Sequence, residues 1–138
     1  MAAPRAFTSF DYDHDATSQV LFCGQADKDS PTPFTVANWS QPTELPQAEW
    51  EALNKARINN CHMLIVLVGK FMASATGVAK EIQMAKDQDV PVFGVYVNGG
   101  DSNSVLPAGL QRNRTVTWTW ANVAACVDQM MTEGKNAK

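Results

Sequence analysis

Short apolar runs alternate with longer amphipathic segments along this chain. Met63 to Val68 and Val90 to Val97 are nearly unbroken runs of aliphatic and β-branched residues, which is typical of parallel strands covered on both faces. Weaker strand patterns precede and follow these two central runs. We therefore predict five strands, at residues 5–10, 33–37, 63–68, 90–97 and 115–118.

Helical segments are expected between and after the strands. The most regular of them carries Val123, Val127 and Met130 on one helical face. Alternating strands and helices, joined by right-handed crossovers, predict an α/β domain with a doubly wound parallel sheet of strand order 2-1-3-4-5. Ligand sites in such a sheet lie at the carboxyl ends of the strands. The four predicted helices cover residues 15–26, 47–60, 77–88 and 120–132.

Composition fits one packed domain spanning residues 1–138 and argues against several classes of function. Apolar residues make up 45% of the chain, the formal net charge is −3, and no run of basic residues occurs. Binding to nucleic acid or to anionic membranes is therefore not expected. No apolar run reaches the roughly 18 residues that a membrane span needs, so we expect a cytoplasmic protein.

The cysteines and histidines give little basis for a metal site. Three widely spaced cysteines are an odd number, which indicates reduced thiols. No CxxC pair exists, and His14 and His62 are far apart in the sequence. The aspartates around His14 lie within one five-residue stretch and lack a distant ligand, so we predict no metal ion.

The first strand runs into a polar segment at its carboxyl end, which makes this segment a candidate binding site. Phe10, Asp11 and Tyr12 are the residues expected to contact a ligand. An alternative carries equal weight for the aspartates: Asp13 or Asp15 caps the helix that follows and offsets its dipole. Either aromatic residue could instead belong to the core.

The loop after the second strand, residues 38–46, is polar and bounded by prolines. Asn38 and Trp39 are candidates for a binding wall, since loops with one large aromatic residue often form part of a site. Trp39 could stack on a base or sugar, or it could fold back onto the following helix. The sequence does not choose between these two roles.

Glu81 is the most informative single position. At 100° per residue, Val78, Ile82 and Ala85 face the sheet, while Glu81 lies at the flank of this apolar stripe. A carboxylate there would be partly desolvated and could stabilise a cationic group. The more common alternative is a glutamate bonded to a nearby backbone amide or arginine.

The sequence lacks the motifs of several familiar nucleotide-binding and phosphoacceptor proteins. There is no G-x-G-x-x-G after a strand, and the pair Gly69 and Lys70 is not part of a P-loop. A phosphoacceptor receiver needs an aspartate at the end of the third strand, where this chain has Gly69. Because Gly69 and Gly94 interrupt the central runs, we expect other groups to approach the backbone closely at both.

Three segments together resemble a known family: residues 7–15, residues 57–70 and residues 78–95, followed by the closing segments 106–107 and 118–120. In their order and spacing they are similar to the TIR-like proteins of the Thoeris anti-phage defence system, the ThsB-type proteins. The resemblance covers nearly the whole chain and implies a flavodoxin-like TIR fold.

This resemblance also implies a function. Proteins of this kind cleave the nicotinamide–ribose bond of NAD, which is a substrate and not a bound cofactor, and release a cyclic or modified ADP-ribose messenger. The messenger activates a partner effector, a phage-derived trigger can start the reaction, and self-association is expected. Whether water or an adenine atom attacks the ribose remains open. The alternative is a non-enzymatic TIR-like adaptor that acts by protein–protein assembly.

The resemblance assigns roles to particular residues. The family motif resembles W-x-x-W-E-I, and the matching stretch here places Glu81 as the catalytic glutamate. Both tryptophans are replaced, by Gly77 and Lys80. The residues expected to bind the nucleotide are Phe10, Asp11, Tyr12, Asn38 and Trp39.

Overall fold

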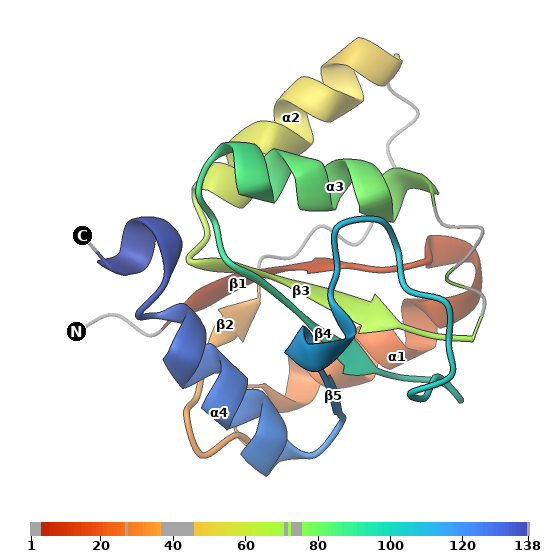
Figure 1. Ribbon diagram of the computed structural model, residues 1–138, viewed down its shortest axis with the longest axis vertical. Coiled ribbons are helices and arrows are strands. Elements are labelled where there is room, and N and C mark those ends of the chain that lie inside the picture. Colours follow the sequence, from red (N-terminus) through yellow and green to blue (C-terminus); the bar gives the residue numbers. More distant parts are fainter. Residues whose placement is uncertain (1–3, 27, 37–45, 71, 73–75, 138) are drawn as a thin grey trace.

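The computed structural model in Figure 1 describes residues 4–26, 28–36, 46–70, 72 and 76–137. The described residues form a sheet of five parallel strands in the order β2-β1-β3-β4-β5, which confirms the predicted topology. Ala6 pairs with Met63 across β1 and β3, and Leu64 pairs with Val92 across β3 and β4. The strands are β1 (Arg5–Ser9), β2 (Thr35–Val36), β3 (Met63–Val68), β4 (Val92–Tyr96) and β5 (Thr115–Thr117).

The fourth strand begins two residues later than predicted. Pro91 has no N–H group to give to a strand ladder, so regular pairing of β4 starts at Val92. The carbonyl of Pro91 still accepts a hydrogen bond from the Leu64 amide, at 2.9 Å. The proline thus marks the amino end of β4.

Four α-helices lie in the described ranges, each close to its predicted position. The first one begins at Tyr12 because the Asp11 carbonyl accepts hydrogen bonds from the His14 and Asp15 amides. Asp11 therefore occupies the cap position, while Asp13 and Asp15 lie within the helix itself. The helices are α1 (Tyr12–Gln25), α2 (Gln47–Asn59), α3 (Thr76–Asp87) and α4 (Trp120–Met130), with short 3₁₀ turns at η2 (Arg112–Arg114) and η3 (Gly134–Ala137).

Helices cover both faces of the sheet, with α2 and α3 on one side and α1 and α4 on the other (Figure 1). Successive β3 side chains point to opposite faces. Leu64 and Val66 therefore pack beneath α2 and α3, whereas Met63 and Ile65 pack against the side of α1 and α4. This two-sided burial is what the continuous apolar run predicts.

Three further findings concern the thiols, membrane spans and groups of metal-ligating side chains. The cysteines are free thiols, at Cys23, Cys61 and Cys126. None of the helices in the described ranges combines the length and the apolar character that crossing a bilayer requires. The described residues also bring no three His, Cys, Asp or Glu side chains together in a group that could hold a metal ion.

Candidate functional site

Helix α3 presents Glu81 to the carboxyl end of β1. Val78, Ile82 and Ala85 are buried against the sheet, as the helical period predicts. Glu81 lies at the edge of this stripe and keeps some solvent exposure. Its Oε1 accepts a hydrogen bond from the hydroxyl of Ser9, the last residue of β1, at 2.6 Å.

A second donor reaches the same carboxylate from the neighbouring helix. The side-chain amide of Asn54, on α2, donates to Glu81 Oε2 at 3.2 Å. Ser9 and Asn54 are both almost completely buried. Glu81 is therefore held by side chains from two other elements. Among the described residues, no backbone amide or arginine takes the place that the alternative interpretation expected.

The environment of Glu81 favours the protonated acid. Burial raises the pKa of Glu81 to about 7, and the hydrogen bond from Ser9 opposes this shift only in part. Ser9 and Asn54 supply donors but no positive charge, and no described residue forms an ion pair with Glu81. The site thus contains a desolvated carboxylate whose charge has no protein counter-ion in the described part of the chain.

The polar segment after β1 forms the start of α1. His14 Nδ1 lies 2.6 Å from Asp11 Oδ2, so the ring donates to a carboxylate that is itself nearly buried. Phe10 is partly buried and packs against the apolar cluster on the side of α1 and α4, on the sheet face opposite to Glu81. Tyr12 is the first residue of α1, and its side chain lies outside the described part of the structure.

Asn38 and Trp39 lie outside the described residues, and so does the loop that contains them up to residue 45. Their predicted contact with a ligand stays a prediction.

A second carboxylate lies deep at the same edge of the sheet. Asp15 is fully buried in the first turns of α1, and its Oδ1 accepts a hydrogen bond from the Asn98 side chain at 3.0 Å. Its Oδ2 has no hydrogen-bond partner in the described part of the protein. Burial is the main cause that raises the pKa of Asp15. Asp15 thus links the start of α1 to the end of β4.

The glycine after β3 makes room for that carboxylate. A Cβ atom at Gly69 would lie 2.3 Å from Asp15 Oδ2, which is too close for any side chain. At Gly94 a Cβ atom would meet Leu110 at 2.9 Å. The predicted close approaches at both glycines are confirmed.

Two patterns in the sequence point to the residues that hold Glu81. Trp50, Asn54 and Ile58 recur every four residues on α2, so Asn54 is a polar residue within an apolar stripe. Ser9 ends the first predicted strand, where carboxyl-end residues approach a ligand site. Pairing either of them with Glu81 required the tertiary structure.

Comparison with known proteins gives a family and a fold. A family model described as the TIR-like domain of the Thoeris protein ThsB matches residues 7–102. The chain also resembles a solved prokaryotic SEFIR domain, with 15% identity, a TM-score of 0.55, and coverage of 93% of this chain and 96% of that one. The SEFIR domain of IL-17 receptor B is similar at 10% identity and a TM-score of 0.50, covering 94% of this chain and 96% of that one. No curated protein matches the sequence.

Proposed function

Since this chain belongs to the TIR-like domain family of the Thoeris protein ThsB, we propose that it cleaves the nicotinamide–ribose bond of NAD, with Glu81 as the catalytic carboxylate. The observation that carries the proposal is the environment of Glu81, a carboxylate held by two neutral donors at the carboxyl edge of the sheet. The ligand sites of doubly wound sheets lie at this edge.

The chemistry of the bond explains why such a carboxylate helps. When nicotinamide leaves, positive charge develops on the ribose, as in the oxocarbenium-like transition state of glycoside hydrolysis. A fixed carboxylate beside this carbon stabilises the charge electrostatically, and the effect is strongest where water is excluded. A counter-ion from the protein would weaken the effect, and no described residue supplies one to Glu81.

The raised pKa of Glu81 is compatible with this role. With a pKa raised to about 7, Glu81 changes its protonation state near neutral pH. The nicotinamide ring of NAD is cationic, and a bound cation favours the ionised carboxylate. Substrate binding would therefore charge the group that the reaction needs.

The replaced tryptophans of the family motif have a partial substitute in space. Trp50 of α2 lies beside Gly77, with its ring 3.7 Å from the point where a Cβ atom of Gly77 would be. An indole side chain therefore still lies at the start of α3, although it comes from the neighbouring helix. This arrangement supports a nucleotide-binding role for the surface that α2 and α3 share.

The finer assignments follow from the same proposal. Phe10, Asp11, Tyr12, Asn38 and Trp39 are proposed to contact the nucleotide. The product is a cyclic or otherwise modified ADP-ribose that acts on a messenger-sensing effector. Self-association and a phage-derived trigger belong to the proposal as well.

Nicotinamide release from NAD tests the proposal directly. Purified protein is incubated with NAD, with and without lysate of phage-infected cells, and the products are separated by chromatography. We expect release by the wild type and by Glu51→Gln, a surface variant on α2, but not by Glu81→Gln. Absence of release by the wild type under both conditions would favour the adaptor, and equal release by Glu81→Gln would remove this residue from the mechanism.

A further inference from the structure

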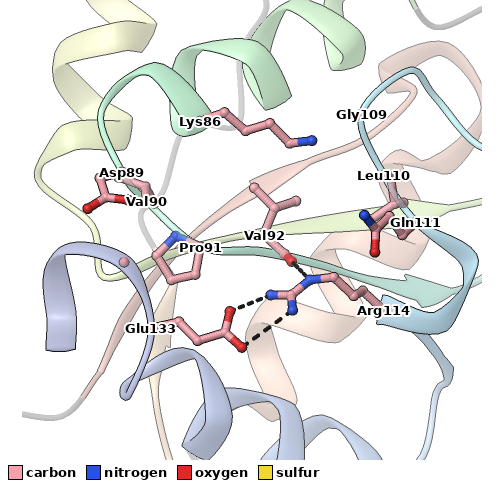
Figure 2. Close-up of a pocket in the computed structure, with 11 residues that line it drawn as sticks. Lys86, Asp89, Val90, Pro91, Val92, Gly109, Leu110, Gln111, Arg114 and Glu133 are labelled. Carbon is pink, nitrogen blue, oxygen red and sulfur yellow. Dashed lines mark hydrogen bonds and ion pairs between the residues drawn. The ribbon is translucent and has the colours of Figure 1, made fainter.

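A pocket of about 390 Å³ opens at the amino edge of the sheet. Glu81 lies at the other edge, where the strands have their carboxyl ends. Val92, which starts β4, lies at its centre, and the turn containing Gly109 and Leu110 forms one wall (Figure 2). Because the strands are parallel, their amino ends meet at the edge that faces away from the carboxyl ends. This pocket is therefore separate from the proposed NAD site.

Two close approaches of glycine shape the walls. Gly109 has φ +93°, and a Cβ atom there would lie 2.9 Å from Ile82 and 3.3 Å from Lys86 Nζ. Gly134 has φ +55°, and a Cβ atom there would lie 2.3 Å from the Asp89 carbonyl oxygen. Larger residues would be strained at both positions, so the glycines allow the turn to lie against α3 and the carboxyl-terminal segment to lie against Asp89.

Two cationic side chains line the pocket, Arg114 and Lys86, and they differ in whether a carboxylate is paired with them. Arg114 donates from Nε to the Val92 carbonyl at 3.0 Å and from its terminal nitrogen to Glu133 Oε1 at 2.6 Å. Its charge is therefore compensated. Lys86 has no hydrogen bond or ion pair with any described residue. Its ammonium group lies beside the Gly109 turn.

Polar and apolar groups lie on different parts of the pocket surface. In Figure 2, the Lys86 ammonium and the Gln111 amide lie on the side of the Gly109 turn, and Asp89 points away from them. Val92 and Leu110, both nearly buried, supply apolar surface between the charged groups. The volume falls within the range of roughly 300–1,000 Å³ that small-molecule sites occupy.

We propose that this pocket binds a small organic anion, a carboxylate or a phosphate monoester that carries an apolar group. Lys86 pairs with the anionic group, the Gln111 amide donates a hydrogen bond to it, and the apolar part packs on Val92 and Leu110. Arg114 stays on Glu133 and fixes the floor of the pocket. The proposal does not depend on NAD cleavage at the other edge.

A series of probes with one ring and different charges tests the class of ligand. Benzoate and phenyl phosphate carry the anion, benzamide is neutral, and benzylamine is cationic. Amide resonances of Val92, Leu110 and Gln111 are followed by two-dimensional NMR of the full chain during titration. We expect at least one anion to bind about fivefold more tightly than benzamide, and benzylamine to bind least. The tighter of the two anions identifies the natural anionic group.

Three variants locate the interaction. Lys86→Gln should weaken binding of the anion about fivefold, whereas Lys80→Gln, which alters a lysine of the same helix paired with Glu51, should leave it unchanged. Glu133→Gln should strengthen binding because Arg114 then becomes available to the ligand. Equal affinities for benzoate, phenyl phosphate and benzamide, or an anion affinity that Lys86→Gln leaves unchanged, would overturn the proposal. Resonance shifts confined to Ser9 and Asn54 would overturn it too.

Discussion

Two glutamates at opposite edges of the same sheet have opposite electrostatic environments. Glu81 accepts hydrogen bonds from Ser9 and Asn54, and burial raises its pKa to about 7. Glu133 accepts hydrogen bonds from Arg114 and Gln129, and the bond from Arg114 is the main cause that lowers its pKa. Two differences separate them: Glu81 is desolvated within the fold, whereas Glu133 is partly exposed and has the positive charge of Arg114 beside it.

This difference shows how a protein can either use a carboxylate for its own stability or keep it for a ligand. The ion pair of Glu133 connects the turn before β5 to the end of α4, and its charge is satisfied within the fold. Glu81 is oriented by its donors but not neutralised by them. A cationic ligand would supply the positive charge that no described residue places beside Glu81.

The largest expected effect comes from removing the charge of Glu81. Glu81→Gln should lower the rate of nicotinamide release by a factor of about 100 to 1,000 or more, since preorganised electrostatic groups typically contribute that much. The amide can still accept from Asn54 and donate to the Ser9 oxygen, so the fold should persist. Initial rates and a circular-dichroism spectrum of the same sample measure both. A loss of less than fivefold would show that the uncompensated charge is not what the reaction uses.

The second effect concerns stability and has the opposite sign for the two glutamates. The folded-state pKa of Glu81 lies above its ordinary value of 4.5, so its contribution to stability is present below pH 4.5 and is lost as the pH rises to about 7. Glu81→Gln should therefore stabilise the fold at pH 8, by at most about 3 kcal/mol, and have little effect at pH 4. Urea denaturation at both pH values measures the difference. A variant that is less stable than the wild type at pH 8 contradicts the pKa assignment.

The third effect separates orientation of Glu81 from simple packing. Ser9→Ala removes the donor that opposes the rise in the pKa of Glu81, so the pH at half-maximal NAD cleavage should move upward by up to about one unit. The loss of one hydrogen bond should cost about 1 kcal/mol of stability. Ser30→Ala is the matched control, because Ser30 is also buried and its hydroxyl bonds, among the described residues, to Thr32 of its own turn. An upward shift in both variants, or in neither, would mean that Ser9 does not act through Glu81.

The smallest effect is expected at the paired glutamate. Glu133→Gln should cost about 0.5–1 kcal/mol at pH 7, since Arg114 and Glu133 are both partly exposed to water. Because the pKa of Glu133 is lowered, this contribution is present above pH 4.5 and is lost as the pH falls through its folded-state pKa. Urea denaturation at pH 7 and pH 3, repeated at high salt, checks the sign. A cost that is larger at pH 3 than at pH 7 would contradict it.

The sequence predicted those features of the fold that depend on local pattern. The apolar runs at residues 63–68 and 90–97 indicated buried strands, and the helical period placed Glu81 beside the stripe of α3. The strand order followed from the alternation of strands and helices and from the handedness of their connections. These are properties of short segments and of general rules for joining them.

The contacts that define the site could not be predicted in this way. Ser9 and Glu81 are far apart in the sequence, and the hydrogen bond between them depends on how α3 lies over β1. The burial of Asp15 depends equally on the missing side chain of Gly69. The pocket near Lys86 combines the end of α3, the turn at Gly109 and the segment after α4. Each of these sites is a product of tertiary packing.

The place of β1 in the sheet has a consequence for how the chain folds during synthesis. This strand is made before the other strands of the sheet, yet it lies between β2 and β3. The strand β2 pairs with it at only two positions, and the longer partner β3 begins only at Met63. Bringing β1 and β3 together costs loop-closure entropy before the contacts between them stabilise the sheet. This cost slows folding compared with that of helical proteins. A nascent chain therefore exposes the apolar strand that ends in Ser9 until about half of the domain has left the ribosome.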